Sequence, residues 1–435
     1  MGSMAPSPPP QMSLADLKAL SVLGQGARGV VFHVVPADTA SSSAPAGNPM
    51  AMALKAMSRA AARHKVRAPG LPCGADMDGH RRIWFERDVL RALRHPLLPS
   101  LRGVVATDAV VGFAIDRCPG GDLKSLLRRR PRFPDSVIRF YAAELVLALE
   151  HLHGLGVVYR DLKPENVLIQ GSGHIMLVDF DLSTTLPPPP PPPPPDAATS
   201  SPTSPSSRHL IINHSKKKKK KKKKKKMASM ISSCCFLLPS SRRTTESSYR
   251  SSRGSSAPQH HKSKSFVGTE DYVAPEIVAG SGHDHAVDWW GLGVVLYEMV
   301  YGATPFRGQS TRETFRRVLD AAPELPGERT PLRDLVARLL EKDPRKRLGA
   351  PGVKRHAFFR GVDWDRVLDV ARPPFIPAPD EYNGGDSSRG EEAEALDVEK
   401  IVHEVFGSGG AADEETPAVK DGTEDEIDDD FSIFF

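Results

Sequence analysis

Cysteine is scarce in this chain, with four residues in 435. None of them lies in a Cys-x-x-Cys spacing or beside a paired histidine, which excludes a zinc-finger type of site and a disulfide framework. Long apolar runs are missing too, because no segment reaches about 18 continuous apolar residues. The sequence also does not begin with charged residues followed by an apolar stretch. We therefore expect a protein of a reducing compartment that is neither secreted nor membrane-spanning.

Charge is distributed unevenly, although the formal net charge is only +6. Residues 187–264 contain 18 lysines and arginines but two acidic residues, whereas residues 380–435 contain three basic and 19 acidic residues. The basic character therefore belongs to one segment and does not describe the body of the protein.

The pattern of the chain predicts one large domain with flanking segments. Apolar residues alternate from Leu17 onward and again over residues 52–57, as in strands, while residues 81–94 and 135–156 have helical spacing. Strands followed mostly by helices favour an α+β fold with a small β-rich lobe stacked on a larger helical lobe. The expected parts are a disordered start at 1–16, a small lobe at 17–116, a large lobe at 117–359, a disordered insert at 187–264 and a tail at 360–435.

A glycine-rich turn links the first two predicted strands. In "GQGARGVV", Gly24, Gly26 and Gly29 precede Val31 in a G-x-G-x-x-G-x-V spacing, and such glycines let backbone amides approach phosphates. Alone, this pattern is more often structural. The following strand adds Lys55, whose amine could reach the same phosphates.

The segment "YRDLKPEN" is more specific. It places a hydroxyl-orienting carboxylate, Asp161, near a phosphate-facing cation, Lys163, and a metal-ligating amide oxygen, Asn166. Asp179 follows the predicted strand "HIMLV" in a "DFD" corner. Further on, "YVAPEI", "DWWGLGVVLYEM" and "KDPRKRLG" supply Glu276, Asp288 and Arg347.

These motifs together resemble the protein kinase family and specifically its AGC group, through "CPGGDL", "GTEDYVAPE", "RHAFFRGVDW", "PPFIP" and the terminal "FSIFF". The "DFD" corner followed by a long insert resembles the plant-specific branch that contains PINOID, the phototropins and UNICORN, with UNICORN-like kinases the nearest match. The resemblance implies a bilobal protein kinase fold and a serine/threonine kinase that uses ATP and Mg²⁺. It covers residues 17–186 and 265–378 densely.

The resemblance also implies roles for individual residues. Lys55 would pair with Glu86 and hold the ATP phosphates. Asp88 fits a shifted register, but Glu86 is favoured because it fits the helical spacing. Asp161 would orient or deprotonate the substrate hydroxyl, and Lys163 would stabilise the transferring group. The remaining ligands would be Asp116 and Cys118 for ATP and Asn166 and Asp179 for Mg²⁺. The alternative is a catalytically idle scaffold. However, Asp179 matches the metal-ligating aspartate of the Asp-Phe-Gly corner found in the family, and Asp181, which replaces its glycine, is a residue type that tolerates positive φ.

Three carboxylates match positions that line the peptide groove of basic-directed AGC kinases: Asp122, Glu165 and Glu298. They would favour arginine or lysine upstream of the acceptor through charge-assisted pairing. Alternatively, Glu298 is an interior helix residue with a local partner. Thr269 would shape the site beside the acceptor and favour serine or threonine over tyrosine.

The resemblance further implies an activating phosphate on Ser265, in "KSKSFVGTEDYVAPE", captured by Arg160. An alternative is that Ser265 only caps or solvates a loop.

The insert combines nine prolines, which predict a stiff spacer, with eleven successive lysines at 216–226. The lysines could bind an anionic membrane, direct nuclear import, contact nucleic acid non-specifically, or have no dedicated role. We expect a cytoplasmic monomer with plasma-membrane association or nuclear entry and no specific nucleic acid.

The acidic tail ends in a match to the Phe-x-x-Phe motif of AGC kinases, formed by Phe431, Phe434 and Phe435. The resemblance implies docking of these rings in a hydrophobic pocket, either on the small lobe of this chain or on an upstream phosphoinositide-dependent kinase.

Overall fold

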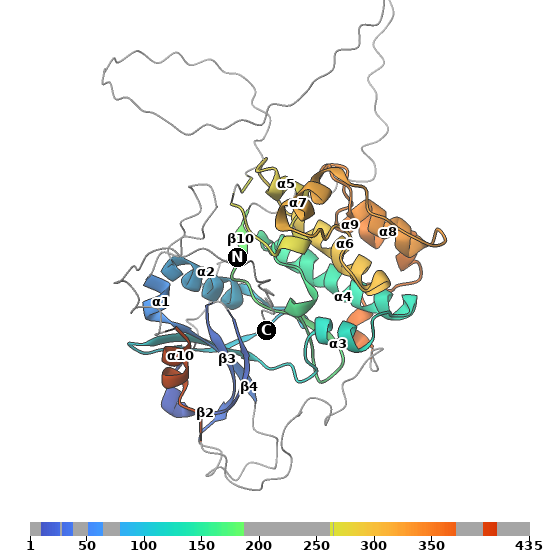
Figure 1. The fold of residues 1–435 in the computed structure, drawn as a ribbon. Coiled ribbons are helices and arrows are strands. Elements are labelled where there is room, and N and C mark those ends of the chain that lie inside the picture. The colour runs from blue at the N-terminus through green and yellow to red at the C-terminus, as the bar shows by residue number, and fades with distance from the viewer. Residues whose placement is uncertain are drawn as a thin grey trace, which may run out of the picture. The chain divides into compact units, whose positions relative to one another are not determined.

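The small lobe is built on a six-stranded sheet with the order β1-β5-β6-β4-β3-β2 (Figure 1). β1 pairs parallel with β5, and the other neighbours are antiparallel. The computed structural model describes residues 10–26, 28–37, 51–63, 79–186, 262–263, 265–370 and 395–406, which belong to one compact unit. The strands are β1 (Gln11–Met12), β2 (Leu17–Gln25), β3 (Val30–Pro36), β4 (Met52–Ser58), β5 (Leu101–Ala106) and β6 (Val110–Asp116).

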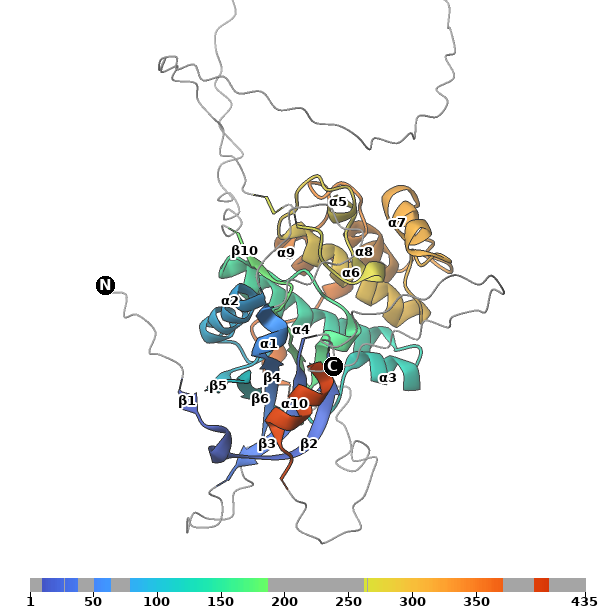
Figure 2. The ribbon, with the colours of Figure 1, turned by 60° about the vertical axis from the view of Figure 1, so that its left-hand side comes forward.

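Helices cover both faces of this sheet, which explains the burial of its central strand. Successive side chains of a strand point to opposite faces, yet β4 is buried from Met52 to Met57. One face packs against α2 (Gly79–Ala92), which follows the short α1 (Arg59–Arg63). The other face packs against α10 (Val398–Phe406), which lies over β2, β3 and β4 (Figure 2).

The large lobe is mostly helical and is centred on α6, in which every residue from Val287 to Met299 is buried. A helix that is apolar on all sides is typical of a core position. Its helices are α3 (Leu123–Arg129), α4 (Asp135–Gly154), α5 (Pro275–Val278), α6 (Ala286–Tyr301), α7 (Thr311–Asp320), α8 (Pro331–Leu339) and α9 (Ala350–Lys354). Its strands are β7 (Val157–Val158), β8 (Val167–Ile169), β9 (Ile175–Leu177) and β10 (Thr184–Thr185). The two-lobed α+β architecture predicted from the sequence is therefore observed.

The prediction of a disordered start up to residue 16 is wrong for residues 10–16. Gln11 and Met12 add a strand to the edge of β5, and the Met12 side chain occupies the space left open by Gly103. Ser13 then caps a 3-10 helix at Leu14–Asp16, whose Asp16 carboxylate accepts from the Ser13 amide at 2.8 Å. Backbone pairing at a sheet edge depends on the partner strand, so composition alone does not reveal it.

Several predicted features lie outside the described residues. These are the segment 1–9, the insert from 187 to 261 with its lysine tract at 216–226, and the terminal Phe431, Phe434 and Phe435. Within the part of the chain that is described, no helix has the length and apolar character needed to cross a membrane.

Candidate active site

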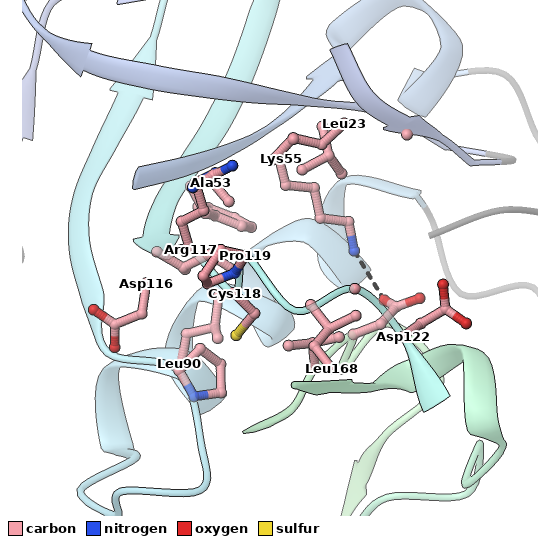
Figure 3. A pocket seen from close by; sticks show the side chains of 18 of the residues that line it. Leu23, Ala53, Lys55, Leu90, Asp116, Arg117, Cys118, Pro119, Asp122 and Leu168 are labelled. Carbon is pink, nitrogen blue, oxygen red and sulfur yellow. Dashed lines mark hydrogen bonds and ion pairs between the residues drawn. The ribbon is translucent and has the colours of Figure 1, made fainter. Parts of the chain in front are cut away.

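A cavity of about 290 Å³ lies between the two lobes and is bordered by the glycine-rich turn, α2 and the β6–α3 connection. Leu23 and Ala53 border it from the small lobe and Leu168 from the large lobe, and the Lys55 side chain points into it (Figure 3). Two apolar walls with a charged group at one end suit a flat aromatic ring attached to an anionic group.

The glycine-rich turn between β2 and β3 forms the small-lobe edge of this cavity. Gly24 pairs with Val31 across the turn, and both line the cavity. The Gly26 amide donates to the Gly29 carbonyl at 2.9 Å. A Cβ on Gly29 would lie 2.7 Å from the Ala56 carbonyl oxygen, so the turn can pack on β4 only with glycine at this position.

Lys55 forms a double ion pair at the inner end of the cavity. Its Nζ lies 2.8 Å from Oε1 of Glu86 on α2 and 2.9 Å from Oδ1 of Asp179. Asp88, the alternative partner, is exposed and pairs with Arg87 instead. Lys55 therefore pairs with Glu86, in the register favoured from the sequence.

Mutual pairing favours the charged forms of Lys55 and Asp179. Burial alone would lower the pKa of the Lys55 ammonium, but the carboxylates of Asp179 and Glu86 outweigh it and raise that pKa. Burial likewise opposes ionisation of Asp179, but Lys55 outweighs it and holds the pKa of Asp179 below its usual value. The Lys55 ammonium therefore faces the Asp179 carboxylate where the lobes meet, whereas burial outweighs the charge of Lys55 at Glu86 and raises the pKa of that carboxyl above its usual value.

A second polar cluster surrounds Asp161, on the loop between β7 and the 3-10 helix Pro164–Asn166. Its Oδ1 accepts from the Thr269 hydroxyl at 2.8 Å, and its Oδ2 accepts from the Asn166 amide at 3.0 Å. Lys163 lies 3.2 Å from Oδ2 of Asp161 and donates to the Thr269 hydroxyl at 3.1 Å. The four side chains predicted to act on the acceptor, the phosphate and the metal thus lie together.

Asn166 carries an unusual orphan atom. The Asn166 side chain is fully buried. Its amide oxygen, Oδ1, has no hydrogen-bond partner among the described residues. A buried acceptor without a partner costs free energy unless something else fills its valence. A divalent cation that takes oxygen ligands fits this position, with Asp179 supplying a carboxylate. The chemistry of the two donors therefore suits Mg²⁺.

The "DFD" corner is not strained at its third residue. Positive φ occurs at Asp179, at 60°, and not at Asp181. Replacement of the usual glycine therefore needs no unusual backbone conformation, and the tolerance of aspartate for positive φ is not called upon. Asp181 instead contributes a carboxylate, which pairs with Arg28 at the tip of the glycine-rich turn.

The connection between the lobes contains the two remaining residues predicted to contact ATP. Asp116 and Cys118 both border the cavity. The Asp116 carboxylate, however, accepts from the Ser100 amide at 2.9 Å and from Arg102 Nε at 2.6 Å, and it points away from the cavity (Figure 3). Asp116 is therefore available to a nucleotide through its backbone.

Asp288 at the start of α6 fixes the backbone of the Asp161 loop. Its carboxylate accepts from the amides of Tyr159 and Arg160, at 2.9 and 2.7 Å, and contacts His153 Nε2 at 2.7 Å. These bonds hold Arg160 at a φ of 70°, in the left-handed region. α6 begins at Ala286, so Asp288 lies in its first turn.

Arg160 reaches the predicted phosphosite. Its Nη1 donates to the Ser265 hydroxyl at 2.6 Å and to the Ser263 hydroxyl at 3.2 Å. Its Nε donates to the Leu182 carbonyl at 2.7 Å, beside the Asp179 corner. One guanidinium therefore connects both ends of the segment that contains the insert.

Glu276 and Arg347 form a buried bidentate ion pair, with N–O distances of 2.7 and 2.9 Å. Their side chains are 3% and 0% exposed. The pair joins α5 to the loop after α8, as expected for a structural pair.

The three carboxylates predicted to bind an upstream basic residue are already engaged. Both oxygens of Asp122 accept from Ser125, as the N-cap of α3. Glu298 accepts from Lys124 at 2.7 Å, and Glu165 lies 3.6 Å from the same ammonium. Glu298 thus has the local partner considered as the alternative.

Sequence reasoning missed the apolar walls of the cavity and Lys124. Ala53 could have been found, because it lies two residues before Lys55 and shares its strand face. Leu168 similarly lies two residues after Asn166. Lys124 gave no signal, because Glu298 is 174 positions away.

Comparisons of the sequence with known proteins identify the family of the chain. The protein kinase domain family matches residues 17–204 and 253–359. The Arabidopsis thaliana serine/threonine-protein kinase OXI1 is 47% identical over 90% of this chain and 85% of its own length. UCNL and AGC1-7 of the same species are 43% and 36% identical, covering 87% and 89% of this chain and 88% and 68% of their own lengths. The identity to OXI1 exceeds that to UCNL, although the motifs suggested UNICORN-like kinases as the nearest match.

Proposed function

Because this chain belongs to the protein kinase family, as a serine/threonine kinase of the plant AGC type, we propose that the Asp161 cluster and the Lys55 triad are its catalytic machinery. The observation that carries this assignment is the convergence of Asp161, Lys163 and Thr269 within hydrogen-bond distance, beside the orphan oxygen of Asn166. Protein substrates follow from the family.

Asp161 acts on the acceptor. Its Oδ1 lies 2.8 Å from the Thr269 hydroxyl, so an acceptor hydroxyl that enters from the same side meets a carboxylate that orients it and receives its proton. Lys163 places a cation beside the path of the transferred group, and phosphoryl transfer depends chiefly on such positioning and neutralisation of charge. Thr269 narrows the entrance and favours serine or threonine over tyrosine.

The residues that line the cavity suit ATP and Mg²⁺. Adenine fits between Leu23 or Ala53 and Leu168, with the backbone from Asp116 to Cys118 at its edge. Lys55, oriented by Glu86, would hold the phosphates at the glycine-rich turn, and Asn166 and Asp179 would hold Mg²⁺. When bound, ATP and Mg²⁺ supply the transferable phosphoryl group and neutralise its developing charge.

Metal removal tests this assignment. The full chain, incubated with radiolabelled ATP, Mg²⁺ and a serine-containing peptide, is expected to label the peptide, because Asn166 and Asp179 would hold the Mg²⁺ that neutralises the phosphate charge. Addition of EDTA in excess is expected to stop labelling, and renewed Mg²⁺ to restore it. Labelling that continues at the same rate in EDTA would contradict the metal assignment.

Regulation through Ser265 is part of the proposal. The Ser265 hydroxyl oxygen lies 2.6 Å from Nη1 of Arg160, so a phosphate on it would add about −1.5 to −2 charge beside this guanidinium. Burial lowers the pKa of Arg160 to about 10, which still leaves it cationic at neutral pH. The stronger pairing would fix the Leu182 end and the Ser265 end of the segment together, next to the Asp161 loop.

Ser265→Ala is therefore expected to lower kcat for peptide phosphorylation by about tenfold, since it removes the only atom of this residue to which a phosphate, the stronger partner of Arg160, can be attached. Ser263→Ala is the matched control, because Ser263 contacts the same nitrogen of Arg160 at 3.2 Å, and we expect less than about a twofold change. Adding Arg160→Ala to Ser265→Ala should lower kcat little further. Mass spectrometry of the active protein should find the phosphate on Ser265; full kcat in Ser265→Ala would show that the switch does not exist.

The flanking segments complete the proposal. Phe431, Phe434 and Phe435 dock either on the small lobe or on an upstream phosphoinositide-dependent kinase, by burial of their rings. The lysines at 216–226 bring the chain to an anionic membrane surface or into the nucleus, by charge. When it is neither bound to a membrane nor in the nucleus, the kinase acts as a monomer in the cytoplasm.

A further inference from the structure

Lys124 is the one cation that the described residues place between two of the groove carboxylates. It lies on the first turn of α3, and its Nζ is 2.7 Å from Glu298 Oε1 and 3.6 Å from Glu165 Oε1. Its side chain is 26% exposed and that of Glu165 is 23% exposed, so solvent reaches both. The pair is therefore open to exchange with a cation from outside.

The Glu298 carboxylate is buried and is held in place by a hydrogen bond. Its side chain is 5% exposed, and its second oxygen accepts from the Tyr272 hydroxyl. A buried carboxylate needs a cation, because an unpaired charge in such a position is costly. Although burial acts in the opposite direction, the hydrogen bond and charge of Glu298 raise the pKa of Lys124, so this partner remains protonated at neutral pH.

Glu165 has spare binding capacity on the same wall. Its Oε2 is buried, and the described part of the chain offers it no hydrogen-bond partner. Glu165 follows Asp161 by four residues in the catalytic loop, and Tyr272 follows Thr269 by three. Glu165 is thus linked to Asp161 by a short backbone segment, and Glu298 is linked to the backbone near Thr269 through its hydrogen bond with Tyr272.

We propose that Lys124 is a specificity-determining residue, whose ammonium occupies the acidic subsite of Glu165 and Glu298 and competes there with a basic side chain upstream of the acceptor in the peptide substrate. This inference rests on the proposed function, which places the two carboxylates in the peptide groove. Because Lys124 is attached to α3, its effective concentration at the subsite is high, and an incoming arginine must displace it. The dependence on upstream arginine is therefore weaker than the carboxylates alone would give.

Removing the competitor should reveal the preference. Lys124→Met keeps the unbranched apolar stem but removes the charge, which leaves Glu298 in need of a cation that a substrate arginine can supply. The measurement is kcat/KM for serine peptides in which arginine or alanine occupies each upstream position in turn. We expect the arginine-to-alanine ratio to increase about tenfold at one upstream position in Lys124→Met, through KM more than through kcat.

Two further variants separate competition from a structural effect. Lys124→Arg keeps a cation at the subsite and should leave the ratio as in the unmutated chain. Glu298→Gln removes the charge for which both cations compete, so adding Lys124→Met to it should no longer raise the ratio. If Lys124→Met does not fold, as judged by its melting transition, Lys124→Gln retains a hydrogen-bond donor without charge and should show the same increase.

The outcomes distinguish this inference from the function on which it rests. One outcome is that the arginine-to-alanine ratio of kcat/KM is the same in the unmutated chain, Lys124→Met and Lys124→Gln while all three still phosphorylate serine peptides. That result would overturn the role of Lys124 but not the proposed function. Failure of the unmutated chain to transfer phosphate to any of the peptides would overturn the proposed function and this inference with it. An increase that persists in the Glu298→Gln background would overturn the assignment of the subsite.

Discussion

Asp179→Asn is expected to lower kcat/KM for peptide phosphorylation by at least about 100-fold. Asparagine has almost the same size as aspartate but removes the charge that pairs with Lys55 at 2.9 Å and that, in the proposed function, binds the cation. Both the neutralisation of phosphate charge and the position of Lys55 depend on it. The loss should appear mainly in kcat when Mg²⁺ and ATP are saturating.

Asp88→Asn is the matched control for this substitution. Asp88 is the aspartate that a shifted register would have paired with Lys55, but its side chain is 58% exposed and pairs with Arg87. We expect its kcat/KM to stay within about twofold of the unmutated value, since an exposed ion pair contributes little. Near-normal turnover of Asp179→Asn, with an unchanged melting temperature, would contradict the catalytic assignment.

Arg347→Ala is expected to reduce the free energy of unfolding by about 3–5 kcal/mol. The substitution leaves the Glu276 carboxylate, 3% exposed, without its bidentate partner in the interior. It also removes the donation from Nη1 to the Ala286 carbonyl at the start of α6. Chemical denaturation followed by circular dichroism measures the loss.

Arg345 offers the comparison for this prediction, two residues earlier in the same loop. Its side chain is 85% exposed and pairs with Asp343 on the surface. Arg345→Ala should leave the unfolding midpoint nearly unchanged, because solvent screens such pairs. Equal destabilisation by the two substitutions would show that burial of the Glu276–Arg347 pair does not determine its contribution.

The sequence predicts most of the catalytic cluster, for a physical reason. Asp161, Lys163 and Asn166 lie on one short loop, so their spacing in sequence already fixes their proximity. Lys55 and Glu86 are farther apart, but each occupies a strand or helix with a recognisable pattern. Their pairing at 2.8 Å agrees with the register chosen from the helical spacing.

Contacts between distant elements could not be predicted in this way. The pairing of Lys124 with Glu298 depends on how α3 and α6 pack, and that of Arg28 with Asp181 depends on how the glycine-rich turn lies over the large lobe. The sequence predicts three carboxylates in the groove but not the ammonium of Lys124, which lies near two of them. For this reason the preference for upstream arginine expected from the sequence does not include the competition that we propose for Lys124.

The same limit explains the error at the start of the chain. A strand of two residues, Gln11–Met12, has no pattern of its own, and it forms because β5 offers an unpaired edge. α10 has a clear apolar stripe, but the surface that it covers, including Leu54 and Val105, becomes visible only when the sheet is assembled.

Phosphate transfer by the full chain tests the central claim most directly. Equal concentrations of the unmutated protein and Asp179→Asn would be incubated with radiolabelled ATP, Mg²⁺ and matched peptides that carry serine or tyrosine as the acceptor. The account predicts label on the serine peptide, little on the tyrosine peptide, and a reduction of at least about 100-fold in the variant. Equal labelling by the two proteins, or label on tyrosine alone, would contradict it.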